Sequence, residues 1–117
     1  MPGLQMRLPL LFDAMVSGGR LGVRKFVELT ATAPARIYGL TRKGSVAVGM
    51  DADLCVWDPS RRVTLSDAMV EDRTGFTPYA GRTVTGWPET VLCRGRVIVA
   101  GGTVTAEAGS GAPIRRG

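Results

Sequence analysis

Residues 43–59, KGSVAVGMDADLCVWDP, separate two parts of the chain that have different sequence patterns. The glycines and aspartates of residues 44–53 are typical of turns, and they lead into the apolar run Leu54 to Trp57. Apolar residues fall on both faces of this run, so we expect a strand that is buried on both sides. Asp58-Pro59-Ser60 predicts the end of that strand, and residues 62–65 could form another short one.

The part before this stretch is predicted to be helical. One helix face is indicated by apolar residues at helical spacing, namely Leu8, Leu11, Phe12, Met15 and Val16, and Ser17-Gly18-Gly19 predicts its end. A second helix carries a stripe made of Val23, Phe26, Val27 and Thr30. A short third helix is expected to be capped by Thr32, to have Pro34 in its first turn and to end at Gly39. We expect these stripes to face a core.

The part after residues 43–59 is predicted to be a set of short strands. Residues 66–81 read as an irregular surface connection, and residues 84–87 resume extended structure. A β-hairpin is indicated by residues 90–93 and 97–99, which flank Arg94-Gly95-Arg96. Gly101-Gly102 predicts a turn into a last strand at residues 103–105, and the small, Gly-rich and basic residues that follow indicate a loosely held tail.

Length and composition limit the possible functions. A chain of 117 residues is enough for one domain, and no window approaches the roughly 20 apolar residues of a membrane span. We find no secretory signal pattern, so a soluble, cytoplasmic protein is expected. The net charge of +5 raises nucleic acid as a partner. However, the basic residues are spread along the chain without interleaved aromatics, which favours a solvated, Arg-rich surface.

The sequence offers no catalytic constellation. It contains no His, which excludes Ser-His-Asp and Cys-His catalysis and imidazole zinc sites within this chain. Cys55 and Cys93 lie too far apart for a CxxC motif and fall in apolar runs, so buried, free thiols in a reducing compartment are expected.

Two pairs of carboxylates are candidate sites. Asp51 and Asp53 have the spacing of a D-x-D metal motif, but the ligands of a calcium loop do not follow them, and turn capping is the favoured role. Glu71 and Asp72 could form an acid and base pair, yet solvated surface charge is the favoured interpretation. The glycine pairs Gly18-Gly19 and Gly101-Gly102 lack phosphate-loop context and are interpreted as turns. We therefore predict no catalytic, cofactor-binding or metal-binding residue in this chain.

Several stretches together resemble the cyclic amidohydrolases of the dihydropyrimidinase and D-hydantoinase type. Residues 2–12 are similar to the segment after the last barrel strand of those enzymes, and residues 26–40 resemble their next helices. Residues 43–59 are similar to the passage KGxIAVGxDADLxxWDP, which leads into the small β-domain of many amidohydrolases. Residues 86–95, GWPETVLCRG, point to the dihydropyrimidinase branch, and residues 77–82 are also seen in allantoinase-like relatives.

This resemblance implies a C-terminal portion of a larger metal enzyme. In such enzymes a TIM barrel holds two divalent metals, usually zinc, with histidines, an aspartate and a carboxylated lysine. None of these ligands can be transferred to a position here. The family reaction is hydrolytic opening of a cyclic amide or imide ring. Two positions depart from the family pattern: Gln5 stands where relatives commonly have Glu, and Glu71 where His is expected.

The predicted fold class is α+β, with N-terminal helices that would cover the barrel and then half of a small antiparallel β-sandwich with hairpins. The expected boundaries are residues 1–43 for the helical segment, 44–105 for the sandwich part and 106–117 for a flexible basic tail. We expect the chain alone to be inactive and to associate with itself or with a barrel-containing chain. Two alternatives stay open: a subunit of a split amidohydrolase, and a small basic domain that binds nucleic acid.

Overall fold

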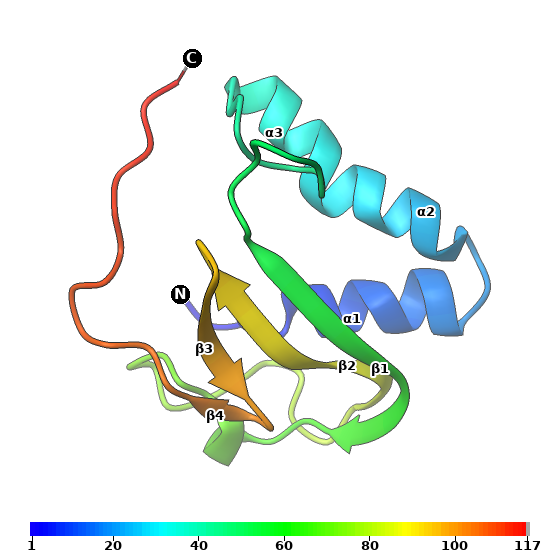
Figure 1. The fold of residues 1–117 in the computed structure, drawn as a ribbon. Coiled ribbons are helices and arrows are strands. Elements are labelled where there is room, and N and C mark those ends of the chain that lie inside the picture. Colours follow the sequence, from blue (N-terminus) through cyan, green and yellow to red (C-terminus); the bar gives the residue numbers. More distant parts are fainter. Residues whose placement is uncertain (117) are drawn as a thin grey trace. The chain divides into compact units, whose positions relative to one another are not determined.

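The computed structural model describes residues 1–116 and has an α+β fold (Figure 1). Its helical elements are α1 (Arg7–Phe12), η1 (Asp13–Ser17), α2 (Gly22–Val27), η2 (Glu28–Thr32) and α3 (Ala33–Tyr38). A short 3₁₀ turn, η3 (Asp67–Met69), precedes the later strands. The strands are β1 (Leu54–Thr64), β2 (Thr83–Cys93), β3 (Arg96–Ala100) and β4 (Thr103–Val104). They form an antiparallel sheet in the order β1-β2-β3-β4, which confirms the predicted class.

The chain divides into two compact units that are each discontinuous in sequence. The first unit consists of residues 1–26 and 58–87, and the second of residues 27–57 and those from 88 on. The predicted boundaries at residues 43 and 105 remain predictions, because they describe the arrangement within a larger enzyme.

The core of the first unit joins the N-terminal helix to the later strands. Its buried members are Met6 before α1, Leu65 after β1, and Val84 and Trp87 of β2. Beside it, the rings of Phe12 and Phe26 meet edge to face, with centroids 5.3 Å apart and planes at 82°. Such pairs add stabilisation beyond the apolar area that they bury. The predicted stripe on the first helix is buried at Phe12 and Met15.

The second predicted stripe is buried only in part. Phe26 is 4% exposed because it packs on Phe12, whereas Val23 and Val27 are 58% and 46% exposed. The expectation that the whole stripe faces a core of this chain is therefore wrong. Helical spacing shows which side chains share a face, but not whether another element covers that face.

Helix ends follow the predicted glycines, but the predicted cap by the Thr32 side chain is wrong. The first helical run ends at Ser17, and Gly19 has a φ of +68°. Helix α3 begins at Ala33, directly after Thr32 as predicted, but Thr32 has helical φ and ψ of −67° and −49° and makes no side-chain cap hydrogen bond, because helical turns continue through η2 into α3. Pro34 lies in the first turn of α3, as predicted, directly after η2. Gly39 ends the run in the left-handed conformation, as predicted, with φ +66° and ψ +37°.

Strand β1 is longer and more exposed than the sequence suggested. It runs through Pro59, where a break was predicted, and β1 lies at the edge of the sheet, which is where strands tolerate proline. Asp58 Oδ1 accepts hydrogen bonds from the N–H and the hydroxyl of Ser60 within the strand. Val56 is 50% exposed, so the expectation of a strand buried on both faces is also wrong.

The predicted hairpin is confirmed. Strand β2 pairs with β3, and Cys93 lies opposite Arg96 at the closed end. The two residues of the turn, Arg94 and Gly95, have φ of +50° and +81°, as a type I′ turn requires. The predicted turn at Gly101-Gly102 leads into β4, which pairs with β3. Within residues 1–116, no helix is long and apolar enough to cross a bilayer.

Candidate functional site

The charged residues at the two ends of the 43–53 loop form an ion-pair cluster in the second unit. Lys43 Nζ lies 2.9 Å from Asp51 Oδ2 and also contacts Asp53 Oδ2. Arg42 Nη2 lies 2.9 Å from the other carboxylate oxygen of Asp51. The side chains of Lys43 and Asp51 are only 13% and 20% exposed, so these pairs are less screened than pairs on an open surface.

The titration of the cluster follows from these contacts. Hydrogen bonds to Asp53 and Asp51 raise the pKa of the Lys43 ammonium. The hydrogen bond from Lys43 lowers the pKa of Asp51, with a further contribution from the charge of Arg42. For Asp53, burial acts to raise the pKa, but hydrogen bonds from Lys43 and from the Arg94 N–H outweigh it and lower the pKa. All three groups are therefore charged at neutral pH.

The cluster also ties the loop to the β2–β3 turn. Asp53 Oδ1 accepts a hydrogen bond of 2.8 Å from the backbone N–H of Arg94. Gly95 N donates to the carbonyl of Ala52 at 3.0 Å, and Asp51 N donates to the carbonyl of Arg42 at 2.9 Å. The two aspartates that resemble a D-x-D motif thus serve the local fold: Asp51 closes the loop, and Asp53 caps the hairpin turn some forty residues away.

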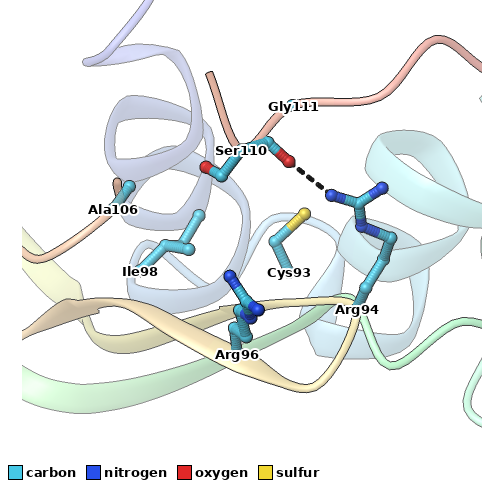
Figure 2. A pocket seen from close by; sticks show the side chains of 7 residues that line it. All are labelled: Cys93, Arg94, Arg96, Ile98, Ala106, Ser110 and Gly111. Carbon is cyan, nitrogen blue, oxygen red and sulfur yellow. Dashed lines mark hydrogen bonds between the residues drawn. The ribbon is translucent and has the colours of Figure 1, made fainter. Parts of the chain in front are cut away.

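A pocket of about 440 Å³ lies against the same hairpin turn in the second unit. Figure 2 shows its lining, which comes from β2, β3, their turn and the segment after β4: Cys93, Arg94, Arg96, Ile98, Ala106, Ser110 and Gly111. The guanidinium of Arg94 donates a hydrogen bond to the carbonyl of Ser110. Sequence reasoning missed this pocket, because the segment that completes it is brought there by the β3–β4 turn. In the sequence, the Arg94-Gly95-Arg96 stretch was the feature that could have pointed to this pocket.

The second carboxylate pair, Glu71 and Asp72, serves a turn of the first unit. Asp72 Oδ1 accepts hydrogen bonds from the N–H and the hydroxyl of Thr74, and these bonds lower the pKa of Asp72. Glu71 is exposed, and its backbone N–H donates to Gln5 Oε1 at 2.8 Å. The structure shows no arrangement of this pair that points to acid–base chemistry in the described residues.

The two positions that depart from the expected family pattern are neighbours. Gln5 accepts from the Glu71 N–H through Oε1 and donates from Nε2 to the carbonyl of Met69 at 2.8 Å. A glutamate at residue 5 could accept from the same N–H, but its ionised carboxylate has no hydrogen to donate to Met69. The amide of Gln5 therefore matches both the donor and the acceptor of the 69–71 segment.

The two cysteines differ in exposure. Cys93 is partly buried and lines the pocket, whereas Cys55 is exposed on β1, so the expectation of two buried thiols is wrong for Cys55. Desolvation of the sulfur nevertheless raises the pKa of Cys55. Its neighbours thus limit the hydration of the thiolate although the residue as a whole reaches solvent.

Comparison with known proteins assigns the chain to a family. The sequence pattern of the amidohydrolase family matches residues 5–98. The chain belongs to the amidohydrolase family. It is 38% identical over 116 residues to a D-hydantoinase of Ralstonia pickettii and 41% identical over 103 residues to one of Rhizobium radiobacter, which covers 98% and 87% of this chain.

Solved structures of amidohydrolases agree with this assignment. The chain superposes on a D-hydantoinase (dihydropyrimidinase) from Thermus sp. with a TM-score of 0.94 and 38% identity, over 99% of its own length. It spans only about a quarter of the length of these relatives, 25% and 22% for the two sequences and 26% for the structure.

The residues of this chain do not fit the metal centre that the family resemblance implies. The sequence has no histidine, and within residues 1–116 no three Cys, Asp or Glu side chains are grouped to hold a metal ion. A carboxylated lysine forms from a neutral amine, but Lys43 is held as an ammonium between Asp51 and Asp53. The acidic oxygens of the cluster are thus already neutralised by Arg42 and Lys43.

Proposed function

We propose that this amidohydrolase chain is the structural C-terminal segment of an enzyme that opens cyclic amide or imide rings, of the D-hydantoinase and dihydropyrimidinase type. The whole enzyme would add water across the ring C–N bond, leaving a carboxylate on one side and a free ureido or amide nitrogen on the other. Bound metal ions would supply the activated water and polarise the carbonyl. The residues that hold those metals would come from a part of the enzyme outside this chain.

One observation carries the proposal. Nearly the whole chain matches a D-hydantoinase with 38% identity and a TM-score of 0.94, yet it corresponds to only 26% of that protein. Sequence and fold thus agree over a segment that has none of the histidines a hydantoinase metal centre would need. In the complete enzyme we place the helices against a TIM barrel and the four-stranded sheet in a small β-sandwich.

Exposed apolar side chains in both units support burial against further protein. In the second unit Val46 and Val48 are 85% and 106% exposed, and Ile37 is 74% exposed. In the first unit an apolar hollow of about 380 Å³ is lined by Leu4, Leu10, Leu11 and Tyr79 among others. Because exposed apolar patches of this kind mark interaction surfaces, we infer that the chain associates with a barrel-containing chain or with itself. A reducing, cytoplasmic location fits its two unpaired thiols.

A complementation assay tests the proposal. The D-hydantoinase of Ralstonia pickettii is produced without the quarter that matches this chain, and the 117-residue chain is supplied as a separate polypeptide. We expect the two polypeptides to copurify and to open hydantoin, with release of the N-carbamoyl acid followed by chromatography. The truncated relative alone should be inactive.

Two controls make the result decisive. The matching segment of the relative, supplied in the same way, shows whether a split enzyme can assemble at all. A Gly86→Ala variant of the present chain, which should disturb the packing of Phe12, should complement poorly. Rescue by the relative's own segment without any rescue by this chain would contradict the proposal.

A further inference from the structure

The segment that follows β4 returns to the β2–β3 turn instead of leading away from it. Thr105 fixes its start, because its N–H and its hydroxyl donate to the carbonyls of Ile98 and Val97 at 2.9 and 3.1 Å. A turn then forms, with Ser110 N donating to the carbonyl of Glu107 at 3.2 Å. Ser110 is half-buried, whereas the other residues of the 106–116 segment are exposed. The segment is therefore anchored at Ser110.

Two arginines of the hairpin hold this anchored part. The Arg94 guanidinium donates to the carbonyl of Ser110, which is a charge-assisted hydrogen bond. Arg96 Nη1 lies 3.9 Å from Glu107 Oε2, and both side chains are largely exposed, so this ion pair contributes little. Arg94 is thus the main contact between the segment and the hairpin.

The thiol of Cys93 lies in the pocket that this segment helps to close. Figure 2 shows the sulfur between the backbone of the hairpin and Ser110, with the Arg94 and Arg96 guanidinium groups on either side. Cys93 is partly buried, whereas Cys55 on the neighbouring strand is exposed.

We propose that residues 106–111 are a strap that closes over the Cys93 thiol, with the Arg94–Ser110 hydrogen bond as its latch, and that the strap controls the access of electrophiles and soft metal ions to this thiol. The side-chain ties between the strap and the hairpin are the Arg94–Ser110 hydrogen bond and the exposed Arg96–Glu107 ion pair, so opening the strap needs only local unfolding. The hairpin itself keeps its own ladder and its ties to Ala52 and Asp53 when the strap opens.

Alkylation kinetics of Cys93 test the strap. In a Cys55→Ser background of the 117-residue chain, iodoacetamide reacts with the Cys93 thiolate, forming an S–C bond and releasing iodide. The reagent is neutral, so it is not drawn to the arginines. Arg94→Asn removes the guanidinium but keeps the N–H to Asp53 and suits the positive φ of a type I′ turn. We expect alkylation about three- to tenfold faster in this variant, read by mass spectrometry.

Three comparisons separate the latch from other effects. Rates are taken at the high-pH limit, where the thiol is fully ionised, so that a change in thiol pKa cannot account for the result. Arg115→Gln removes a charge from the same segment but from outside the pocket, and should leave the rate unchanged. Amide exchange of Val97 to Val99 should be the same in all variants, which shows that the hairpin is intact.

A chain that ends at Thr105 lacks the strap and therefore gives the alkylation rate expected when the strap is fully open. It should react at least as fast as Arg94→Asn, and the Arg94→Asn change should add nothing to it. Equal rates in the parent, Arg94→Asn and the shortened chain would overturn the proposal. Acceleration in the shortened chain alone would overturn the assignment of Arg94 as the latch.

Discussion

Gly86 of β2 lies against the ring of Phe12, so closely that a Cβ at Gly86 would be 2.2 Å from Phe12 Cδ1. The backbone of Gly86 also has a φ of +97°, which L-residues rarely adopt. Glycine is therefore required twice over at this position, once for its conformation and once for its size. The contact sets how the N-terminal helix packs on β2 within the first unit.

A Gly86→Ala substitution should destabilise the chain strongly. Overpacking costs about 1–3 kcal/mol and a positive φ about a further 1 kcal/mol, so we expect a loss of about 2–4 kcal/mol. Urea unfolding measures it. Gly81→Ala is the matched control, because Gly81 has a φ of +85° but nothing within 4 Å of an added Cβ, so it should show the conformational cost alone. Equal losses in the two variants would show that Phe12 moves aside freely.

Gln5→Glu should weaken the tie between the N-terminus and the 69–71 segment. At pH 7 the carboxylate of the variant cannot donate to the Met69 carbonyl, and we expect a loss of about 0.5–1.5 kcal/mol. Below pH 4 the protonated carboxyl regains a donor, so the difference from the parent should shrink. Unfolding at pH 7 and at pH 3.5 measures this. A loss that is as large at pH 3.5 would mean that size, and not the donor, matters at this position.

Asp53→Asn should reveal the charge contribution of the ion-pair cluster. The variant keeps an oxygen to accept from the Arg94 N–H but loses its charge toward Lys43. Asp53 is more than a third exposed, so the loss at pH 7 should be below about 1 kcal/mol. The folded-state pKa of Asp53 is lowered, so its contribution is present above the unfolded pKa of about 3.9 and is lost as pH falls below it.

The difference in unfolding free energy between the parent and Asp53→Asn should therefore be constant from about pH 5 to 8 and should vanish toward pH 2. Equilibrium unfolding across this range measures it. A difference that grows on acidification would contradict the sign of the pKa shift.

Cys55 and Cys93 should both titrate as free thiols in denatured, unreduced protein. At a pH where both thiols are ionised, so that the raised pKa of Cys55 does not slow its reaction, Cys55 of the native chain should react first, because it is exposed while Cys93 lies in the pocket under the 106–111 segment. Site-resolved mass spectrometry after brief alkylation gives the order. Denatured protein with neither thiol free would show that the two cysteines are bridged after all.

The chain alone should neither retain stoichiometric zinc nor open hydantoin or dihydrouracil. Without histidines it could offer only carboxylate and thiolate donors, and the carboxylates nearest to one another are already paired with Arg42 and Lys43. Metal analysis after dialysis, together with a ring-opening assay, measures this. Two metal ions per chain together with turnover would contradict it.

By itself the sequence determined the local structure at positions where the backbone conformation favours one residue type. Gly39 and Gly19 ended helices because glycine adopts a positive φ without a Cβ clash, and Gly95 indicated the hairpin turn for the same reason. The family, too, could be recognised from sequence, because residues 43–59 and 86–95 resemble one group of enzymes in order along the chain.

Only the tertiary structure decided which of these elements are covered and what the charged residues do. Periodicity predicted Val23 and Val27 as core, yet burial depends on a second surface that lies elsewhere in the sequence, and only Phe26 meets one. Asp53 read as a local turn residue, but its carboxylate caps a turn at Arg94. Packing and strand register decide which residues distant in sequence lie close together. Neither can be predicted from the spacing of residues along one segment.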